Sequence, residues 1–288
     1  MNFTKIKNKS DKLVSVAIYA FILVSLIGCN DTGNVQQLPQ RKYQLVWSDE
    51  FDSVAGASPD ATKWSFDLGG GGWGNNEYEV YTNSPANAST DGNGNLAIKT
   101  SLPKWVTDHW ENIYSARINT KGKFEQAYGR FEARIKTPYG SGMWPAFWLL
   151  GANKDTIGWP QCGEIDIMEL NGSKSSIING SLHGPGYSHG AAITKSFALA
   201  NARYNADFHV FAIEWGKDYI DYFVDNVLYQ EITPTNVLGK GDWVFNDHPF
   251  YILLNIAVGG DYVTSPTQQT PFPQTMLVDY VRVYKEVK

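Results

Sequence analysis

Apolar and polar residues alternate with a period of two along most of the chain from Tyr43 onward. Segments 130–137, 208–215, 251–258 and 276–287 show this alternation or carry β-branched and aromatic runs. Side chains of a β-strand point alternately to opposite faces, so this period is typical of strands. Segment 219–232 holds two such runs around Asp225-Asn226, a dipeptide that favours a two-residue hairpin turn. Helical periodicity is confined to a turn or two near 234–240.

Most of the 27 Gly and 13 Pro stand between these apolar runs, where turns are expected. The pattern therefore predicts one all-β domain over residues 42–288, a sandwich of two antiparallel sheets. Of the two cysteines, Cys29 belongs to the N-terminal segment, which leaves Cys162 without an intrachain partner. We expect the stability of the domain to come from a large core.

The first 29 residues differ from the rest. Four Lys and one Asp precede or flank an apolar run at 13–28, which is short for a membrane span of about 20 residues and suits an export signal. Leu26-Ile27-Gly28-Cys29 resembles the lipobox of bacterial lipoproteins. The resemblance implies a lipoprotein signal peptide at 1–28 and lipidation at Cys29, followed by a polar tether at 29–41. It also implies export and a lipid anchor to the bacterial cell envelope, at the outer membrane or cell surface. An ordinary cleaved signal and a retained membrane anchor remain open.

The charge of the chain narrows the class of ligand. The formal net charge is −5, and without residues 1–29 it is −8, with no basic cluster. Nucleic acids and anionic lipid surfaces are poor partners for such a protein. We therefore expect a neutral ligand, with membrane contact through a lipid anchor only, and a monomer.

The segment Gly-Glu-Ile-Asp-Ile-Met-Glu-Leu at 163–170 places three carboxyl groups in an otherwise apolar stretch. In a strand, Glu164 and Asp166 share one face, whereas strict alternation sends Glu169 into the core. A lone glutamate in an apolar core costs several kcal/mol or must hold a proton. One extra residue, a β-bulge, returns Glu169 to the face of the other acids. We predict that Met168 is this inserted residue.

Carboxyl groups on one face of a sheet can perform catalysis. A retaining glycosidase needs two carboxylates about 5–5.5 Å apart, and an acid between them can tune their pKa values. The alternatives are a solvated strand face or a calcium site, which usually also takes loop carbonyl oxygens. Trp144, Trp148 and Trp159 stand just upstream of the acids, and a water-facing strand has no need of them. The tryptophans favour catalysis.

Glu-Ile-Asp-Ile-Met-Glu at 164–169 resembles the signature of glycoside hydrolase family 16 in its bulged form. Segments 115–151, 158–170, 181–187 and 250–260 resemble the laminarinase branch, the endo-1,3-β-glucanases. The similarity extends over nearly all of 43–286. It implies a β-jelly-roll with a concave substrate cleft, and hydrolysis of laminarin-type β-glucan with retention, through a covalent glycosyl-enzyme intermediate.

By position, the resemblance makes Glu164 the nucleophile, Asp166 the assisting acid and Glu169 the general acid/base. Glu164 must be ionised to attack, whereas Glu169 must start protonated. We therefore predict opposite environments for the two glutamates, with the pKa of Glu169 raised.

A neutral glucan has apolar CH faces and hydroxyl rims, so its site needs aromatic platforms and a few polar groups. Trp144 and Trp159 match positions that line the cleft in the family, and the even spacing puts Trp148 on the strand face of Trp144; each could instead pack in the core. The Gly-rich segment 68–77 is either a flexible surface loop or a cleft wall in which Trp73 stacks on a sugar. The predicted substrate-binding residues are Asn75, Arg117, Trp144, Trp148, Trp159 and His183.

The remaining histidines, at 109, 189, 209 and 248, show no metal-ligand spacing and are expected to be structural. Arg117 could instead form an ordinary surface charge pair. The resemblance also implies a structural calcium ion on the convex side, at Glu50, Gly94 and Asp279, partly through backbone oxygens. Catalysis itself requires no cofactor.

Other functions fit the same scaffold. One group hydrolyses mixed-linkage β-1,3-1,4-glucan or algal galactans; sulfated galactans usually call for Arg and Lys in the cleft, and this acidic chain has few. A second possibility is a non-catalytic glucan-binding surface lipoprotein, although such relatives lose the acids that are present here. A purely structural surface lipoprotein would not gather tryptophans beside acids. Endo or exo action depends on loop height over the cleft and stays open.

Overall fold

The computed structural model describes residues 41–287. The predicted signal peptide at 1–28, Cys29 and all of the tether except Arg41 lie outside the described residues. Within the described part, none of the helices combines the length and apolar character needed to cross a bilayer.

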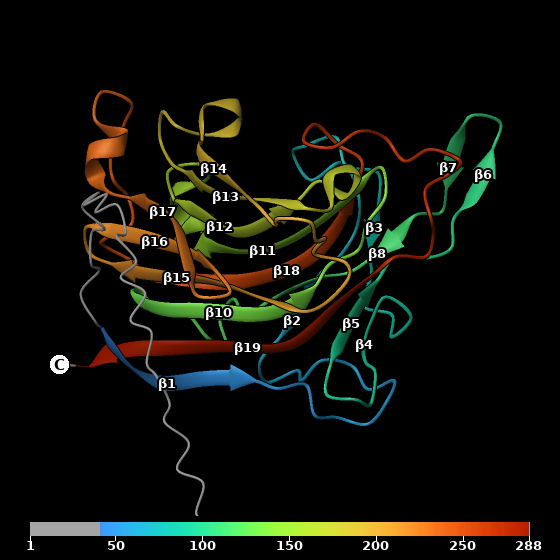
Figure 1. The fold of residues 1–288 in the computed structure, drawn as a ribbon, viewed down its shortest axis with the longest axis horizontal. Helices are drawn as coiled ribbons and strands as arrows, with labels where there is room; N and C mark the ends of the chain where they lie inside the picture. Colours follow the sequence, from blue (N-terminus) through green and yellow to red (C-terminus); the bar gives the residue numbers. More distant parts are fainter. Residues whose placement is uncertain (1–40, 288) are drawn as a thin grey trace, which may run out of the picture. The chain divides into compact units, whose positions relative to one another are not determined.

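Two antiparallel sheets form a β-jelly-roll sandwich, which confirms the predicted fold (Figure 1). Sheet A has the order β17 (Val227–Ile232), β16 (Tyr219–Val224), β15 (His209–Gly216), β10 (Gly129–Lys136), β19 (Thr275–Val287), β5 (Leu96–Lys99) and β4 (Ala88–Thr90), and β1 (Lys42–Asp49) also pairs with β19. Sheet B has the order β14 (Ile193–Ala198), β13 (Ile177–His183), β12 (Glu164–Leu170), β11 (Met143–Gly151), β18 (Phe250–Val258), β9 (Arg117–Asn119) and β2 (Ser65–Asp67).

Smaller elements connect these strands. A short parallel pair is formed by β3 (Val80–Tyr81) and β8 (Tyr114–Ser115), and a hairpin by β6 (Lys104–Val106) and β7 (His109–Glu111). The helical elements are α1 (Lys154–Ile157) and the 3-10 turns η1 (Gly172–Lys174), η2 (His189–Ala191) and η3 (Pro234–Val237).

The strands expected from the alternation are confirmed as β10, β15, β18 and β19, and the expected helical turn is η3. The hairpin of β16 and β17 turns at Asp225 and Asn226, with φ of 49° and 63°. A two-residue turn with both φ values positive matches the right-handed twist of the flanking strands. Short side chains such as these tolerate that conformation best among the non-glycine residues.

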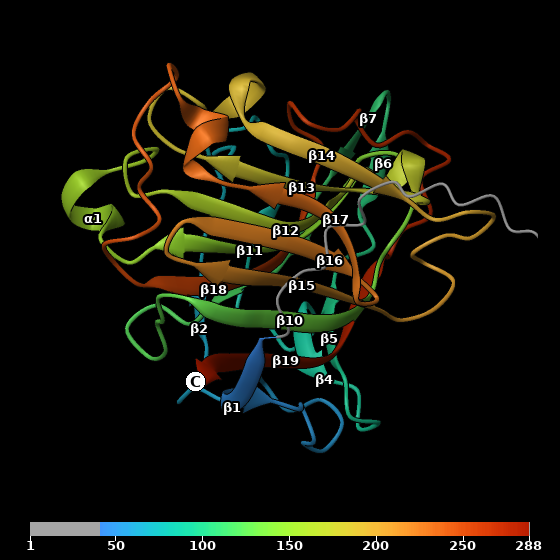
Figure 2. The same cartoon turned by 60° about the vertical axis from the view of Figure 1, so that its left-hand side comes forward.

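The core lies between the two sheets. In Figure 2, β15 to β17 of sheet A lie over β11 to β13 of sheet B. The largest fully buried side chains include Phe131, Phe211 and Trp215 from sheet A and Phe147 and Phe250 from sheet B. Burial of one such side chain contributes about 1.5–3 kcal/mol. This rigid packing fixes β11, β12 and β13, whose other face carries the site described below.

Candidate active site

The acid-bearing strand β12 contains a β-bulge. Opposite β11, Asp166 faces Trp148 and Met168 faces Phe147, so that Ile167 has no partner on that strand. The predicted insertion of one residue is therefore confirmed. It is the pair Ile167–Met168 that forms the bulge, with Ile167 rather than Met168 left unpaired opposite β11.

On its other side, β12 pairs with β13. Ser181 and Asn179 face Asp166 and Glu169, so Gly180 between them faces both residues of the bulge. A Cβ atom on Gly180 would clash with the ring and hydroxyl of core tyrosines. The glycine therefore leaves room for two tyrosines of sheet A, Tyr222 and Tyr229, to pack against β13 at the level of the bulge.

The bulge separates acids from apolar residues on β12. Ile165, Ile167, Met168 and Leu170 are at most 1 % exposed and belong to the core between the sheets. Glu164, Asp166 and Glu169 lie on the opposite face, where each contacts side chains of sheet B or of its loops. The three carboxyl groups share the face of sheet B that is turned away from sheet A.

Glu169 is held by two donors. Trp144 Nε1 donates to Oε1 at 2.9 Å, and Ser181 Oγ approaches Oε2 at 3.5 Å. Trp144 stands on β11 and Ser181 on β13, so the strands on both sides of β12 orient this side chain. Burial raises the pKa of Glu169 to about 6.

Glu164 has a tryptophan donor of its own. Trp159 Nε1 donates to Oε2 at 2.8 Å from the loop that leads into β12. Burial, followed by the negative charge of Asp166, raises the pKa of Glu164 to about 8.

Asp166 lies between the two glutamates and is 3 % exposed. His183 Nε2 is 3.0 Å from Asp166 Oδ2, a close polar contact without the alignment of a full hydrogen bond. His183 Nδ1 accepts the backbone N–H of His189 at 3.2 Å. The proton of the neutral imidazole is thereby assigned to Nε2, which faces Asp166. Burial, and then the charge of Glu169, raises the pKa of Asp166 well above its ordinary value.

The prediction of opposite environments for the glutamates is wrong. The pKa of Glu169 is raised as expected, but the pKa of Glu164 is raised further. Asp166 is buried and both glutamates are partly buried in one cluster, and each glutamate receives one indole donor, so desolvation dominates for both. Moving one proton from Glu164 to Glu169 leaves the charge of the cluster unchanged. The state with Glu164 ionised and Glu169 protonated therefore adds no buried charge.

Trp148 shares the strand face of Trp144 and faces Asp166 across the two strands, but its indole N–H is directed to another partner. Its Nε1 donates to Asn255 Oδ1 at 2.8 Å. Arg117 lies between two indoles, with its Cζ 4.7 Å from the ring centre of Trp148 and 4.9 Å from that of Trp73. Arg117 Nε is 2.8 Å from Asp67 Oδ2. The arginine is thus a stacked and largely buried side chain rather than an ordinary surface charge pair.

Asn75 lies on the Gly-rich segment 68–77, which packs against the loop after β18. Its backbone oxygen accepts the N–H of Asp261 at 2.8 Å. A Cβ atom on Gly260 would come 2.7 Å from that same oxygen and 3.4 Å from the ring of Trp144. Asn75 and Trp144 are therefore neighbours across Gly260, and the segment forms a wall beside the acids.

Several residues of the site were not predicted. His189, expected to be structural, places its ring centre 4.6 Å from that of Trp159. Tyr262 lies 5.0 Å from Trp144, and its hydroxyl accepts Asn179 Nδ2 at 3.0 Å. The alternation of polar residues along 179–183 is a signal that could have located this neighbouring strand. His189 and Tyr262 stand in loops and leave no comparable pattern.

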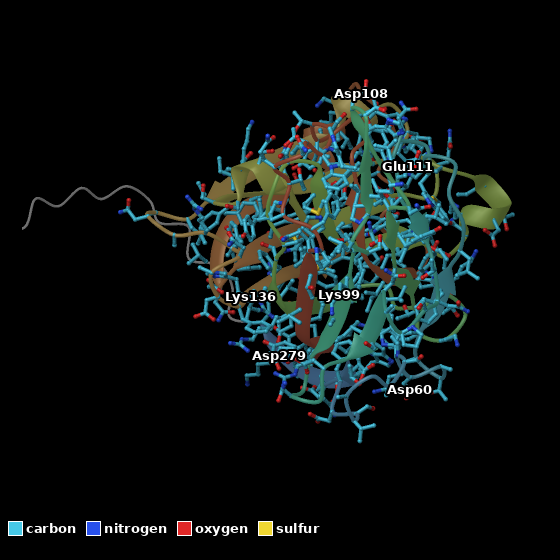
Figure 3. All side chains as sticks on the ribbon, turned by 90° about the vertical axis from the view of Figure 1, so that its right-hand side faces the viewer. Asp60, Lys99, Asp108, Glu111, Lys136 and Asp279 are labelled. Atoms are coloured by element: carbon cyan, nitrogen blue, oxygen red, sulfur yellow. The ribbon has the colours of Figure 1, made fainter. Side chains whose placement is uncertain are left out.

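The two carboxylates expected at a calcium site are each paired with an arginine. Glu50 accepts two hydrogen bonds from Arg282, at 3.0 and 2.7 Å, and Asp279 is paired with Arg134. Figure 3 shows Asp279 at the surface of β19. A cation at these carboxylates would have to replace an arginine, so the side chains as they lie do not fit calcium. The ion, with Gly94 as its third ligand, stays a prediction.

One group of potential metal ligands occurs within residues 41–287. Ligand atoms of Glu164, Asp166 and His183 lie within 4.8 Å of one another. Two of the three, Glu164 and Asp166, are acids of the β12 cluster described above.

Two partly buried glutamates that flank a buried aspartate, with indole side chains beside them, are typical of a glycoside hydrolase site. The model of the Glycosyl hydrolases family 16 matches residues 74–282. The chain belongs to this family.

Similar proteins and structures support this assignment. A beta-glucanase of Rhodothermus marinus is 38 % identical over 276 residues, which are 93 % of this chain and 94 % of the relative. The laminarinase catalytic domain of Thermotoga maritima superimposes with a TM-score of 0.79 at 44 % identity, covering 86 % of this chain and all of the other. A keratan-sulfate endo-1,4-beta-galactosidase of Sphingobacterium multivorum is 35 % identical over 255 residues, 88 % of this chain and 57 % of the relative.

Proposed function

We propose that the protein is a retaining endo-β-1,3-glucanase that hydrolyses laminarin-type β-glucans through a covalent glycosyl-enzyme intermediate. The observation that carries this proposal is the bulge of β12, which places Glu164 and Glu169 on one face with Asp166 between them. The similarity to a beta-glucanase and to a laminarinase supports a β-glucan as the substrate.

In the first step, a carboxylate oxygen of Glu164 bonds to the anomeric carbon as the bond from that carbon to the glycosidic oxygen breaks. Glu169 gives its proton to the departing oxygen. In the second step, Glu169 takes a proton from water, whose oxygen displaces Glu164 from the anomeric carbon. Two displacements at one carbon restore its original configuration.

The neighbouring side chains set up these steps. Asp166 and His183 lie next to Glu164. The N–H at Nε2 of His183 points toward Asp166. Trp144 and Trp159 orient the two glutamates through their indole N–H groups. Their rings also supply apolar surfaces of the kind that the CH faces of glucose need.

Substitution of the glutamates tests the proposal. Glu164→Ala and Glu169→Gln should abolish turnover of a β-1,3-glucan while the fold and oligosaccharide binding are largely kept. Addition of azide to Glu164→Ala should restore cleavage of an activated glucoside and give the α-glycosyl azide, because azide then takes the place of the nucleophile. Undiminished turnover by either variant would refute the assignment.

Hydrolysis of a panel of polysaccharides tests the proposed substrate class. One purified batch should release oligosaccharides from laminarin faster than from lichenan, agarose or carrageenan. Release of a series of oligosaccharides indicates endo action, whereas a single small product indicates exo action. A preference for agarose or carrageenan would favour the galactan alternative. Binding to laminarin without release of products would favour a glucan-binding protein.

We also propose that the protein is a lipoprotein anchored through Cys29 and acts as a monomer. The proposal rests on the lipobox-like Leu26-Ile27-Gly28-Cys29, and on an acid cluster and tryptophans that come from a single chain. Cys29→Ala should move the protein from the membrane fraction to the soluble fraction. Unchanged partitioning would exclude the lipid anchor.

A further inference from the structure

A second pair of carboxyl groups lies behind the Gly-rich wall, and the proposed mechanism does not use it. Glu79 is 1 % exposed, and its Oε2 accepts the backbone N–H of Val258 at 2.7 Å. Its other oxygen, Oε1, is buried and receives no hydrogen bond. Glu77 is its neighbour two residues earlier, on the same side of the extended segment. A buried acid placed beside another acid needs a structural reason.

Glu77 is the end point of a hydrogen-bond network that begins on the cleft face. Trp148 donates to Asn255 Oδ1 at 2.8 Å, Asn255 Nδ2 donates to Tyr81 Oη at 3.0 Å, and Tyr81 donates to Glu77 Oε2 at 3.3 Å. Asn75 Nδ2 donates to Glu77 Oε1 at 3.0 Å. Both carboxylate oxygens of Glu77 therefore accept, and both branches of the network are directed toward this one group.

The acceptor-only character of a carboxylate fixes the orientation of its partners. Because Nδ2 of Asn75 is bound to Glu77, the amide presents its Oδ1 as the free group. Within residues 41–287, no donor forms a hydrogen bond with that oxygen. Oδ1 can accept a hydrogen bond from a sugar hydroxyl, whereas an amide turned by 180° would offer an N–H instead.

Glu79 is the second acid of the pair, and its protonation state affects Glu77. Burial, together with the neighbouring Glu77 carboxylate, raises the pKa of Glu79 to about 9. Glu79 thus keeps its proton at neutral pH and can donate it in a hydrogen bond to Glu77. A protonated Glu79 avoids placing a second negative charge beside Glu77, whose two oxygens accept from Asn75 and Tyr81.

We propose that Glu77 is a positioning residue that locks the amide of Asn75 with its oxygen available to a glucan hydroxyl. Through Tyr81 and Asn255, it also holds the indole of Trp148. The inference rests on the proposed function. It gives Glu77, an acid outside the catalytic cluster, a role in selectivity. A sugar with a hydroxyl group next to Asn75 Oδ1 can donate to that oxygen, whereas a sugar without this hydroxyl leaves the oxygen without a donor.

Kinetics of variants test the positioning role. Glu77→Gln should raise KM for laminari-oligosaccharides about tenfold, with kcat within about twofold, because a remote binding contact is lost equally from ground state and transition state. Asn75→Ala should give a similar rise. The rise in KM of the double variant should be smaller than the product of the two single rises, because both changes remove the contact made by Asn75.

Two substitutions of Glu79 provide a matched pair. Glu79→Gln keeps a donor toward Glu77 and an acceptor for Val258, so its KM should stay within about twofold of that of the unmodified chain. Glu79→Leu removes the donor and should raise KM as Glu77→Gln does. A merely structural role would instead leave KM unchanged and lower the melting temperature of both Glu79 variants.

The outcomes separate this inference from the function on which it rests. A chain that hydrolyses laminarin but shows independent, additive effects of Glu77→Gln and Asn75→Ala would overturn the positioning role alone. So would a KM unaffected by Glu77→Gln. A chain without turnover or binding of any β-glucan would overturn the proposed function and this inference with it.

Discussion

Trp144 Nε1 donates a hydrogen bond of 2.9 Å to Oε1 of Glu169, the carboxyl group proposed to protonate the leaving oxygen. The same indole ring lies beside Tyr262 and the loop that carries Asn75. One side chain thus joins the surface for sugar binding to the proton donor. Changes to its ring and to its N–H group should therefore have different effects.

Trp144→Phe should separate the two roles, because it keeps an aromatic ring and removes the N–H donor. The indole donor lowers the pKa of Glu169, so its loss should raise that pKa. Glu169 has the lower of the two glutamate pKa values, so the acid limb of the kcat/KM profile should move to higher pH. KM should change little. An acid limb that stays in place would show that the indole does not control the pKa of Glu169.

The pH profile of the unmodified protein should be bell-shaped with a maximum between about 6 and 8. Burial raises the pKa of Glu169 to about 6 and that of Glu164 to about 8, and the active state holds one proton on this pair. Below the lower value both glutamates are protonated, and above the higher value both are ionised. Initial rates on laminarin at constant ionic strength measure the profile. A maximum below pH 5 would indicate ordinary, solvated carboxyl groups.

The register that the bulge gives to β12 can be tested by measuring the stability of Met168 variants. Met168 is fully buried in the core, whereas strict alternation would place it beside the acids. Met168→Ala should lower the free energy of unfolding by about 2–5 kcal/mol, and Met168→Leu, the matched control, by less than about 1.5 kcal/mol. Urea unfolding followed by tryptophan fluorescence measures both. Equal and negligible effects of the two substitutions would contradict the observed register.

Glu79→Gln should change stability with a definite sign of pH dependence. The pKa of Glu79 is about 9 in the folded protein and near 4.5 in the unfolded chain. The folded state therefore binds more protons between these values, and its stability falls as pH rises through this window. Glutamine has no such proton to lose. The melting temperature of the variant should equal that of the parent near pH 4 and exceed it by several degrees near pH 8.5. A constant difference across this range would contradict a protonated Glu79.

The alternation of residues predicted the strands, and the cost of burying a lone glutamate predicted the face of Glu169, because both depend on neighbours in the chain. The predicted position of the bulge was correct to within one residue. The choice between Ile167 and Met168 as the unpaired residue depends on how β12 pairs with β11 and β13. A period of two contains no information on that pairing.

Contacts between distant segments could not be predicted in this way. Tyr81 and Asn255 are 174 residues apart, and the pairing of Glu50 with Arg282 joins positions 232 apart. The raised pKa of Glu164 has a similar origin. Its desolvation is a property of the folded cluster, and no short segment of sequence contains it.

The anomeric configuration of the first product tests the central claim most directly. Proton NMR during hydrolysis of a laminari-oligosaccharide shows whether the new reducing end is formed as the β or the α anomer, before mutarotation mixes them. Two glutamates on the same face of β12, acting as nucleophile and acid/base, require the β anomer first. Initial appearance of the α anomer would mean that water attacks directly, and it would contradict the role of Glu164 as a nucleophile.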